Sequence, residues 1–415
     1  MFLFLKRNIS KIILIFILSI ILAYVTNISS IPKSIILFEN EEFSIDIIAG
    51  LKLEETITVG SNIGTEVSSK VKSIGSNNKK QYNLSLLGFN LKTITANVIE
   101  NTKVIPLGNL IGLKLYTDGV LVVGMSEIKG KDNKIYKPYD DAGIEQGDSI
   151  IEINNTKVST TEDLIQCVSK CKGEAIDVTY IKDGNVLKTQ IIPVKASDNT
   201  YKIGLWVRDA EAGIGTATFY DKATNSFGAL GHGIQDIDTE ELVDISSGEF
   251  VTTQIVNIQK GEKQNPGKIE GTIEDCKKIG NIYSNTNFGI YGNSINTSEL
   301  NLSGIQEVEI ASRNQIEIGK ATLICSLEDG IRKEYEIEIQ KVFINNNDNN
   351  KSMVVKITDE ELLEKTGGII QGMSGSPIIQ NGKLIGALTH VFVSDPTKGY
   401  ALFADTMLQQ TRTIK

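Results

Sequence analysis

An apolar run near the N-terminus constrains this chain more than any other feature of its sequence. The residues from Ile12 to Val25 carry no charge, and Lys6, Arg7 and Lys11 precede them without a neighbouring acid. A helix needs about 20 apolar residues to cross a bilayer, so the run is a marginal span that also fits a signal-peptide core. Because no A-x-A cleavage site follows, we favour a signal-anchor over residues 1–30, with a cleaved signal peptide as the alternative.

The remainder of the chain is expected outside the cytoplasm. The positive-inside rule places residues 1–11 in the cytoplasm, so the protein is either membrane-anchored or secreted. The net charge of −9 argues against a nucleic-acid partner. The cysteines form no C-x-x-C pair, and His232 and His390 are the only histidines, which excludes a multi-histidine metal site. We therefore expect no metal and no cofactor.

Short segments with the character of strands fill most of the exported part. The chain has 37 glycines against 7 prolines, a balance that favours hairpins and tight turns over a helical bundle. Residues 31–102 read as a small β domain without a chemical motif. From 198 to 415, short strands divided by Gly and Asn predict a second β-rich domain. The expected fold class is therefore mainly β.

The segment 103–197 has its own pattern. The string AGIEQGDSIIEIN (142–154) combines a tight turn with the start of a strand, and a capped amphipathic helix follows at 160–173. Two further strands then meet at the Asp183-Gly184 hairpin turn. This order resembles a PDZ domain.

The PDZ resemblance implies a peptide-binding site. It assigns the carboxylate-binding loop to Ile111, Gly112 and Leu113, whose N–H groups would hold a peptide C-terminus. The bound peptide would add as a strand between the strand 112–117 and the helix 161–171. A PDZ domain with a purely structural role remains the alternative.

The strongest chemical signal is a glycine-rich segment around a serine, GMSGSP at 372–377. The glycines permit a sharp bend that exposes the Ser374 hydroxyl, and they allow the N–H groups of Gly372 and Ser374 to point at one oxyanion. A strand, the Asn381-Gly382 turn and the strand 384–393 follow.

A histidine between glycines is the second signal, in GALGHGI at 228–234. A serine hydroxyl needs a base to remove its proton, and His232 is our candidate for that base. His390 is expected near the site without acting as the base. Spacing alone leaves the third member of a triad open among Asp236, Asp238, Asp244, Asp275, Asp329, Asp348 and Asp359.

These two segments resemble known peptidases. The serine loop with its following hairpin resembles chymotrypsin-like serine peptidases. Together, 228–239 and 366–400 are similar to the stage IV sporulation protein B peptidases of spore-forming bacteria. That resemblance implies a chymotrypsin-like double β-barrel, and it places the triad acid at Asp359, although a dyad of His232 and Ser374 remains possible.

The same resemblance implies a biological setting. Such an enzyme crosses the forespore membrane, with its catalytic domain on the extracytoplasmic side, and cleaves itself near its N-terminus. It then cuts a membrane-bound regulator, which releases a late sigma factor, while its PDZ domain restrains it and presents peptide tails. Its partners would be protein substrates, peptide C-termini, itself and the membrane.

Three alternatives compete with this interpretation. A Ser-Lys processing peptidase would need a lysine base, and Lys383 lies on a hairpin turn rather than on a helix. A non-catalytic membrane-anchored PDZ adaptor would bind peptide tails and carry a relic peptidase domain. High-temperature-requirement peptidases place the PDZ domain after the protease, whereas here it comes first.

Overall fold

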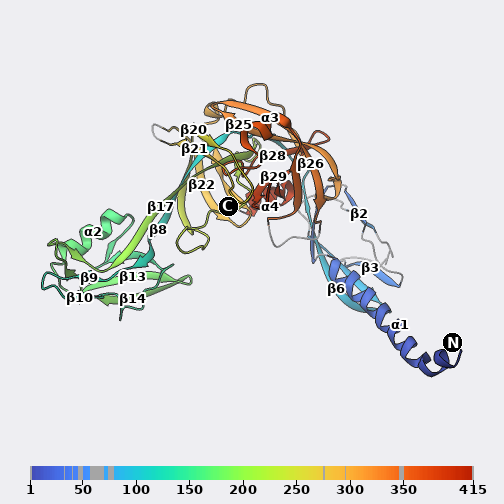
Figure 1. Ribbon diagram of the computed structural model, residues 1–415, viewed down its shortest axis with the longest axis horizontal. Helices are drawn as coiled ribbons and strands as arrows, with labels where there is room; N and C mark the ends of the chain where they lie inside the picture. Colours follow the sequence, from blue (N-terminus) through green and yellow to red (C-terminus); the bar gives the residue numbers. More distant parts are fainter. Residues whose placement is uncertain are drawn as a thin grey trace.

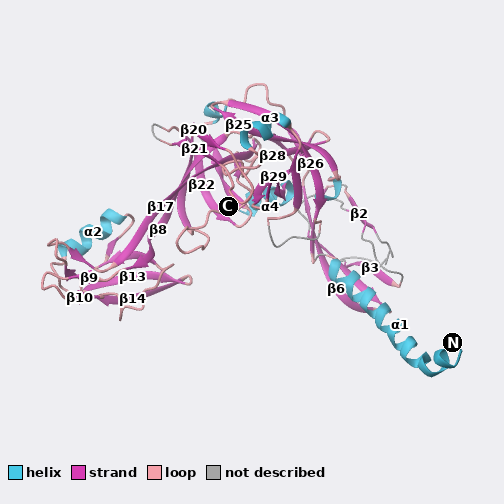
Figure 2. Cartoon of the chain, viewed as in Figure 1, coloured by secondary structure: helices cyan, strands magenta, loops and turns pink. Residues whose placement is uncertain are grey.

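The computed structural model describes residues 2–31, 33–39, 41–44, 50–56, 70–72, 79–273, 276–294, 296–344 and 350–413. Figure 1 shows an N-terminal helix and a small sheet at one end, a PDZ-like unit at the other, and a pair of barrels between them. Strands dominate every part except the N-terminal helix (Figure 2). The predicted mainly β fold class is confirmed.

The N-terminal helix is α1 (Phe2–Ser30), and its stretch Lys11–Ser29 is long and apolar enough to cross a membrane. The small β domain follows, with the strand order β1-β6-β5-β3. Its strands are β1 (Ser34–Phe38), β3 (Leu51–Thr56), β5 (Lys79–Leu86) and β6 (Phe89–Ile99), beside the short pair β2 (Glu42–Ser44) and β4 (Lys70–Lys72). Ile28 and Ile31 of the helix region pack against the core of this sheet.

The first barrel is a closed ring of antiparallel strands in the order β8-β19-β22-β23-β18-β17 and back to β8. The strands are β8 (Leu110–Met125), β17 (Leu205–Asp221), β18 (Ser226–Ala229), β19 (Ile245–Val251), β22 (Lys278–Thr286) and β23 (Gly289–Ser294). Phe227 and Phe250 stack in its core, with ring centroids 4.5 Å apart.

The second barrel closes in the order β25-β26-β27-β30-β29-β28 and back to β25. Its strands are β25 (Gly319–Glu328), β26 (Ile331–Val342), β27 (Met353–Ile357), β28 (Pro377–Gln380), β29 (Lys383–Phe392) and β30 (Asp395–Phe403). Around the two barrels lie β7 (Lys103–Pro106), β20 (Gln254–Gln259), β21 (Lys268–Thr272), β24 (Val308–Ile310), α3 (Glu360–Thr366), α4 (Ala404–Thr413) and the 3₁₀ turns Thr297–Leu300 and Arg313–Gln315.

The PDZ-like unit has its own core around Val120, Ile150 and Val178. Its elements are β9 (Ile128–Lys129), β10 (Ile135–Tyr136), β11 (Ser149–Ile153), β12 (Thr156–Lys157), α2 (Thr161–Lys170), β13 (Ile176–Lys182), β14 (Asn185–Ile191), β15 (Val194–Lys195) and β16 (Tyr201–Lys202). The capped helix that the sequence pattern predicts is present as α2, and a capping box joins Thr160 to Asp163 at its start.

The boundary between these units differs from the predicted one at 197/198. The long strands β8 and β17 run through both: Leu205 pairs with Met125 in the PDZ-like unit, and Thr216 pairs with Leu110 in the first barrel. Residues 110–117 are therefore a barrel strand, and the PDZ-like unit is inserted between two neighbouring strands of that barrel (Figure 1).

Candidate active site

The serine loop is held in shape by glycine backbone and by contacts across the barrels. Gly372 and Gly375 have φ angles of +97° and +96°, and a Cβ on Gly375 would lie 2.0 Å from the carbonyl oxygen of Thr216. Only glycine fits such a position. On β17, the Thr216 N–H donates to the Ser374 carbonyl at 2.9 Å, and the Thr218 hydroxyl donates to the Gly375 carbonyl at 2.8 Å.

The structure brings Ser374, His232 and His390 to one cavity of about 410 Å³ between the barrels. The Ser374 hydroxyl donates to the carbonyl oxygen of Thr389 at 2.8 Å, rather than to either imidazole. Attack on a substrate therefore requires the hydroxyl to rotate away from Thr389. Catalytic hydrogen bonds are often made only once substrate is bound.

His232 lies on the loop that follows β18, where Gly231 adopts a φ of +72°. Its Nδ1 is 2.8 Å from the carbonyl oxygen of Gly233. Because a carbonyl can only accept, Nδ1 carries the proton and Nε2 carries the lone pair that a general base needs. Burial lowers the pKa of His232, and the Gly233 carbonyl partly opposes that shift, so the ring is neutral at neutral pH.

His390 lies on β29, and its ring centroid is 5.1 Å from that of His232. Burial, followed by repulsion from His232 and Lys351, lowers the pKa of His390 to about 4. Its Nδ1 is buried without a hydrogen-bond partner in the described part of the chain. The ring is thus held neutral beside His232, as expected for a residue near the site.

The predicted oxyanion donors are available. Met373 N–H donates to the Ile370 carbonyl and Gly375 N–H donates to the Leu388 carbonyl. In contrast, the N–H groups of Gly372 and Ser374 have no protein acceptor among the residues that the structure describes. Their assignment as an oxyanion hole stays a prediction that this geometry supports.

Asp359 is not beside His232, which contradicts its predicted place as the triad acid. It is the N-cap of α3: one carboxylate oxygen accepts from Leu362 N–H at 2.9 Å, and the other accepts from Glu336 N–H at 3.3 Å. Among the described residues, no carboxylate contributes to the pKa shift of His232, and the Gly233 carbonyl is the group that orients the ring.

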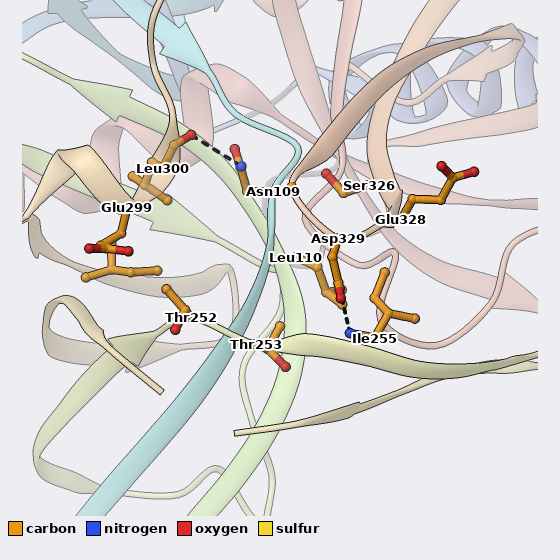
Figure 3. Close-up of a pocket in the computed structure, with 12 residues that line it drawn as sticks. Asn109, Leu110, Thr252, Thr253, Ile255, Glu299, Leu300, Ser326, Glu328 and Asp329 are labelled. Carbon is orange, nitrogen blue, oxygen red and sulfur yellow. Dashed lines mark hydrogen bonds between the residues drawn. The ribbon is translucent and has the colours of Figure 1, made fainter. Parts of the chain in front are cut away.

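Three of the other candidate acids, Asp329, Asp236 and Asp238, are engaged elsewhere. Figure 3 shows Asp329 in a different cavity, where its carboxylate accepts from Ile255 N–H at 2.7 Å. Asp236 is buried and forms an ion pair with Arg208, which also binds Asp238. Asp244 does not line the serine cavity. Asp275 and Asp348 lie outside the described residues.

This placement changes what substitution of Asp359 should do. Asparagine caps helices as well as aspartate does, so Asp359→Asn should keep kcat/KM within a few-fold of the wild type. Asp359→Ala should lower the free energy of unfolding by about 1 kcal/mol through loss of the cap. Peptide hydrolysis and thermal unfolding of both variants measure this, and a rate loss near 10⁴ in Asp359→Asn would restore a triad role.

The predicted carboxylate-binding loop has the backbone of a barrel strand. Ile111, Gly112 and Leu113 lie inside the first barrel, where they pair with β17 on one side and β19 on the other. Their backbone is therefore committed to the barrel sheet, although a PDZ family model begins at 111.

The same tripeptide recurs as Ile203-Gly204-Leu205, beside α2. This second copy lines a cavity of about 570 Å³ together with Leu164 and Val168 of α2 and the exposed Trp206. At its start, β17 pairs with β8 along one edge, and no described strand pairs with the edge facing α2. The repeated I-G-L string was the signal that sequence reasoning missed.

Asn285 on β22 was not found by sequence reasoning either. Its side-chain NH₂ donates to the carbonyls of Ile234 and Val243, and its oxygen accepts from Ile234 N–H, each within 2.9 Å. These bonds fix the loop that carries His232. Because Asn285 is far from His232 in sequence and belongs to no motif, only the fold reveals this role.

Family models match two successive parts of the chain. A family model described as SpoIVB peptidase S55 matches residues 199–408, and one for a PDZ domain matches residues 111–192. A Clostridium perfringens protein with the provisional name of zinc metalloprotease is 25% identical over 92 residues, which are 21% of this chain and 28% of that protein. The chain thus spans less than a third of that relative's length.

Several solved structures are also similar. The PDZ domain of the SdrC-like protein from Listeria monocytogenes is 22% identical, covering 22% of this chain and 87% of that chain at a TM-score of 0.17. The active form of the Rv3671c protease from M. tuberculosis is 11% identical, and the match covers 49% of this chain and 74% of that chain at a TM-score of 0.27. The HtrA-type protease AlgW with a decapeptide is 10% identical, and the match covers 74% of this chain and 65% of that chain at a TM-score of 0.30.

The paired barrels, the serine loop and the adjoining PDZ unit define the class of PDZ-containing serine peptidases. Because the S55 family model spans half of the sequence, the chain belongs to the SpoIVB peptidase S55 family. The family predicted from the two sequence segments is confirmed.

Proposed function

We propose that this protein is an exported serine endopeptidase in which Ser374 is the nucleophile and His232 the general base. One observation carries the proposal: a serine on a glycine-rich loop, a neutral imidazole with a free Nε2 and two unpaired N–H groups all border one cavity. His232 takes the hydroxyl proton as the oxygen attacks, and Gly372 and Ser374 N–H stabilise the oxyanion. The proton then passes to the leaving amine.

The cavity supports a preference for apolar substrate residues. Ile369, Ile370 and Val391 line it beside the serine, and none of its lining residues carries a charge. A charged side chain at the scissile bond would lose its hydration without gaining a partner. The substrate is therefore a peptide segment with an aliphatic residue on the acyl side of the cleaved bond.

The test is covalent labelling of the purified full chain with peptidyl diphenyl phosphonates, which react only with an activated serine. A reagent with a valine side chain should label faster than the matched lysine reagent. If the lysine reagent labels faster than the valine reagent, the preference for apolar residues is wrong but the serine nucleophile stands. If neither reagent labels the chain, the serine endopeptidase proposal is wrong and the non-catalytic PDZ adaptor is favoured. The Ser-Lys alternative has no support, because Lys383 pairs with Glu309 at 3.2 Å.

The proposed setting is sporulation signalling at the forespore membrane. Family membership supports it, and the apolar helix α1 supports a membrane anchor that leaves the barrels on the extracytoplasmic side. In this setting the enzyme cleaves itself and then a membrane-bound regulator, which activates a late sigma factor.

The groove between α2 and Ile203–Trp206 is the proposed site for a peptide C-terminus, added as a strand to the free edge of β17. Trp206 is the only tryptophan, and 63% of its surface is exposed, so its fluorescence should shift when a peptide ending in valine binds. The same peptide with an amidated C-terminus should leave it unchanged.

A glycine variant tests the location of this groove. Gly204→Ala should abolish the fluorescence response, because φ is +80° and the new Cβ would meet the Ser126 carbonyl oxygen at 2.7 Å. Gly304→Ala is the matched control, with the same φ and no atom within 4 Å. An equal response to acid and amide peptides would refute carboxylate recognition.

A further inference from the structure

The turn that joins β5 to β6 and the start of β6 carry three exposed apolar side chains. Leu87, Phe89 and Leu91 are 88%, 75% and 44% exposed, and we call these three residues the hairpin tip. In the described part of the small β domain, every strongly exposed large apolar side chain belongs to this tip. Such clustering on a soluble surface marks an interaction site.

The backbone of the turn strengthens this argument. Leu87 has a φ of +52° and Gly88 a φ of +84°, so both central residues of the turn are in the left-handed region. Asparagine or aspartate would be favoured over leucine at the first of these positions. A bulky apolar residue there is unfavourable both for the backbone and for contact with water, so a partner that binds leucine explains it.

The tip lies at the same end of the small β domain as α1. The Lys92 ammonium donates to the carbonyl oxygens of Ile28 and Ile31, where α1 ends. Nearer the turn, Leu86 of the hairpin lies beside Gly50, which precedes β3: a Cβ on Gly50 would be 3.6 Å from the Leu86 side chain and 3.5 Å from the Tyr24 hydroxyl of α1. The hairpin therefore runs back along α1 as it approaches its turn (Figure 1).

Simple geometry gives the level that the tip reaches. Phe89 precedes Lys92 by three strand residues, or about 10 Å, and this distance equals about six to seven residues of helix. About six to seven residues back from Ile28, the tip is level with Ile21 and Leu22 of α1, inside the apolar stretch Lys11–Ser29. The sequence between Leu84 and Leu91 carries no charge.

We propose that the hairpin tip inserts into the outer membrane–water interface beside α1, as a second contact of the protein with the lipid bilayer. This proposal rests on the proposed role of α1 as a membrane anchor. Insertion is limited to about 5–10 Å, the headgroup–acyl boundary, because the open edges of a hairpin cannot enter the hydrocarbon core. The charged Lys92 then stays at the membrane surface, and the hairpin inserts no farther along its strands than this residue.

Tryptophan fluorescence in lipid vesicles tests this contact with the full chain. In a Trp206→Phe background, Phe89→Trp should show blue-shifted emission in vesicles. Most of that emission intensity should be quenched when the vesicles contain brominated phosphatidylcholine. Tyr283→Trp in the same background is the matched control. It lies on β22 of the first barrel, is 52% exposed, and should remain unquenched.

Flotation of the same samples separates the two proposals. If the chain floats with the vesicles while Phe89→Trp behaves as Tyr283→Trp does, the hairpin proposal is wrong and the anchor stands. If the chain does not float, both are wrong. Quenching of Phe89→Trp alone supports insertion, whatever the peptidase activity of the sample.

Discussion

Replacing Ser374 with alanine should reduce kcat by a factor on the order of 10⁶ and abolish phosphonate labelling. The Ser374 hydroxyl oxygen is the proposed nucleophile, and without it the oxyanion donors that remain can supply only a residual rate. The loop itself should persist, because its hydrogen bonds to Thr216 and Thr218 use the carbonyls of Gly372, Ser374 and Gly375. Hydrolysis of an apolar peptide and mass spectrometry of the labelled chain measure both effects.

Ser376→Ala is the matched control for this experiment. The Ser376 side chain is fully buried two positions farther along, and its hydroxyl has no hydrogen-bond partner in the described part of the chain. Its loss should therefore leave labelling and kcat close to the wild type. Continued labelling of Ser374→Ala, or loss of labelling in Ser376→Ala alone, would show that the nucleophile has been assigned wrongly.

Replacing His232 with alanine should reduce kcat about as strongly as loss of the serine, because the two residues act as one unit. His390→Ala should retain far more activity, since the proposed base and its Gly233 acceptor remain in place. Comparison of kcat/KM for the two variants measures this. A larger loss in His390→Ala would make His390 the base.

The pH dependence provides an independent check of the same base. Burial lowers the pKa of His232 from 6.5, so the reactive neutral form persists below pH 6.5. The logarithm of kcat/KM should stay level as the pH falls to that value and should decline only as the pH passes through the lowered pKa. An acid limb centred above 6.5 would contradict a buried, carbonyl-oriented imidazole.

The parts of the site that the sequence predicted are those encoded by local chemistry. Glycines around Ser374 and His232 are required by backbone angles that other residues resist, so each motif is recognisable in its own segment. The β-rich fold class follows from equally local patterns of turns and short strands. Such features depend on neighbours in the chain and need no knowledge of distant contacts.

The errors concern features that depend on long-range pairing. Asp359 was selected because of its place in a family pattern, but one of its oxygens caps the helix that starts beside it and the other accepts from Glu336 N–H. The Ile-Gly-Leu string occurs twice, and only strand pairing distinguishes Ile111 in the barrel from Ile203 beside α2. The amino-acid sequence alone does not show which of the two Ile-Gly-Leu copies lies on a strand with an unpaired edge.

The continuous strands β8 and β17 also determine how this protein can be divided. A fragment that begins at residue 198 would lack the stretch 110–117 and would leave β17 and β19 with open edges. The peptidase therefore cannot be isolated by a single truncation. The PDZ unit could instead be deleted as an internal segment. Tyr116 on β8 pairs directly with Ala210 on β17, so a two-residue turn could join the two strands at that point.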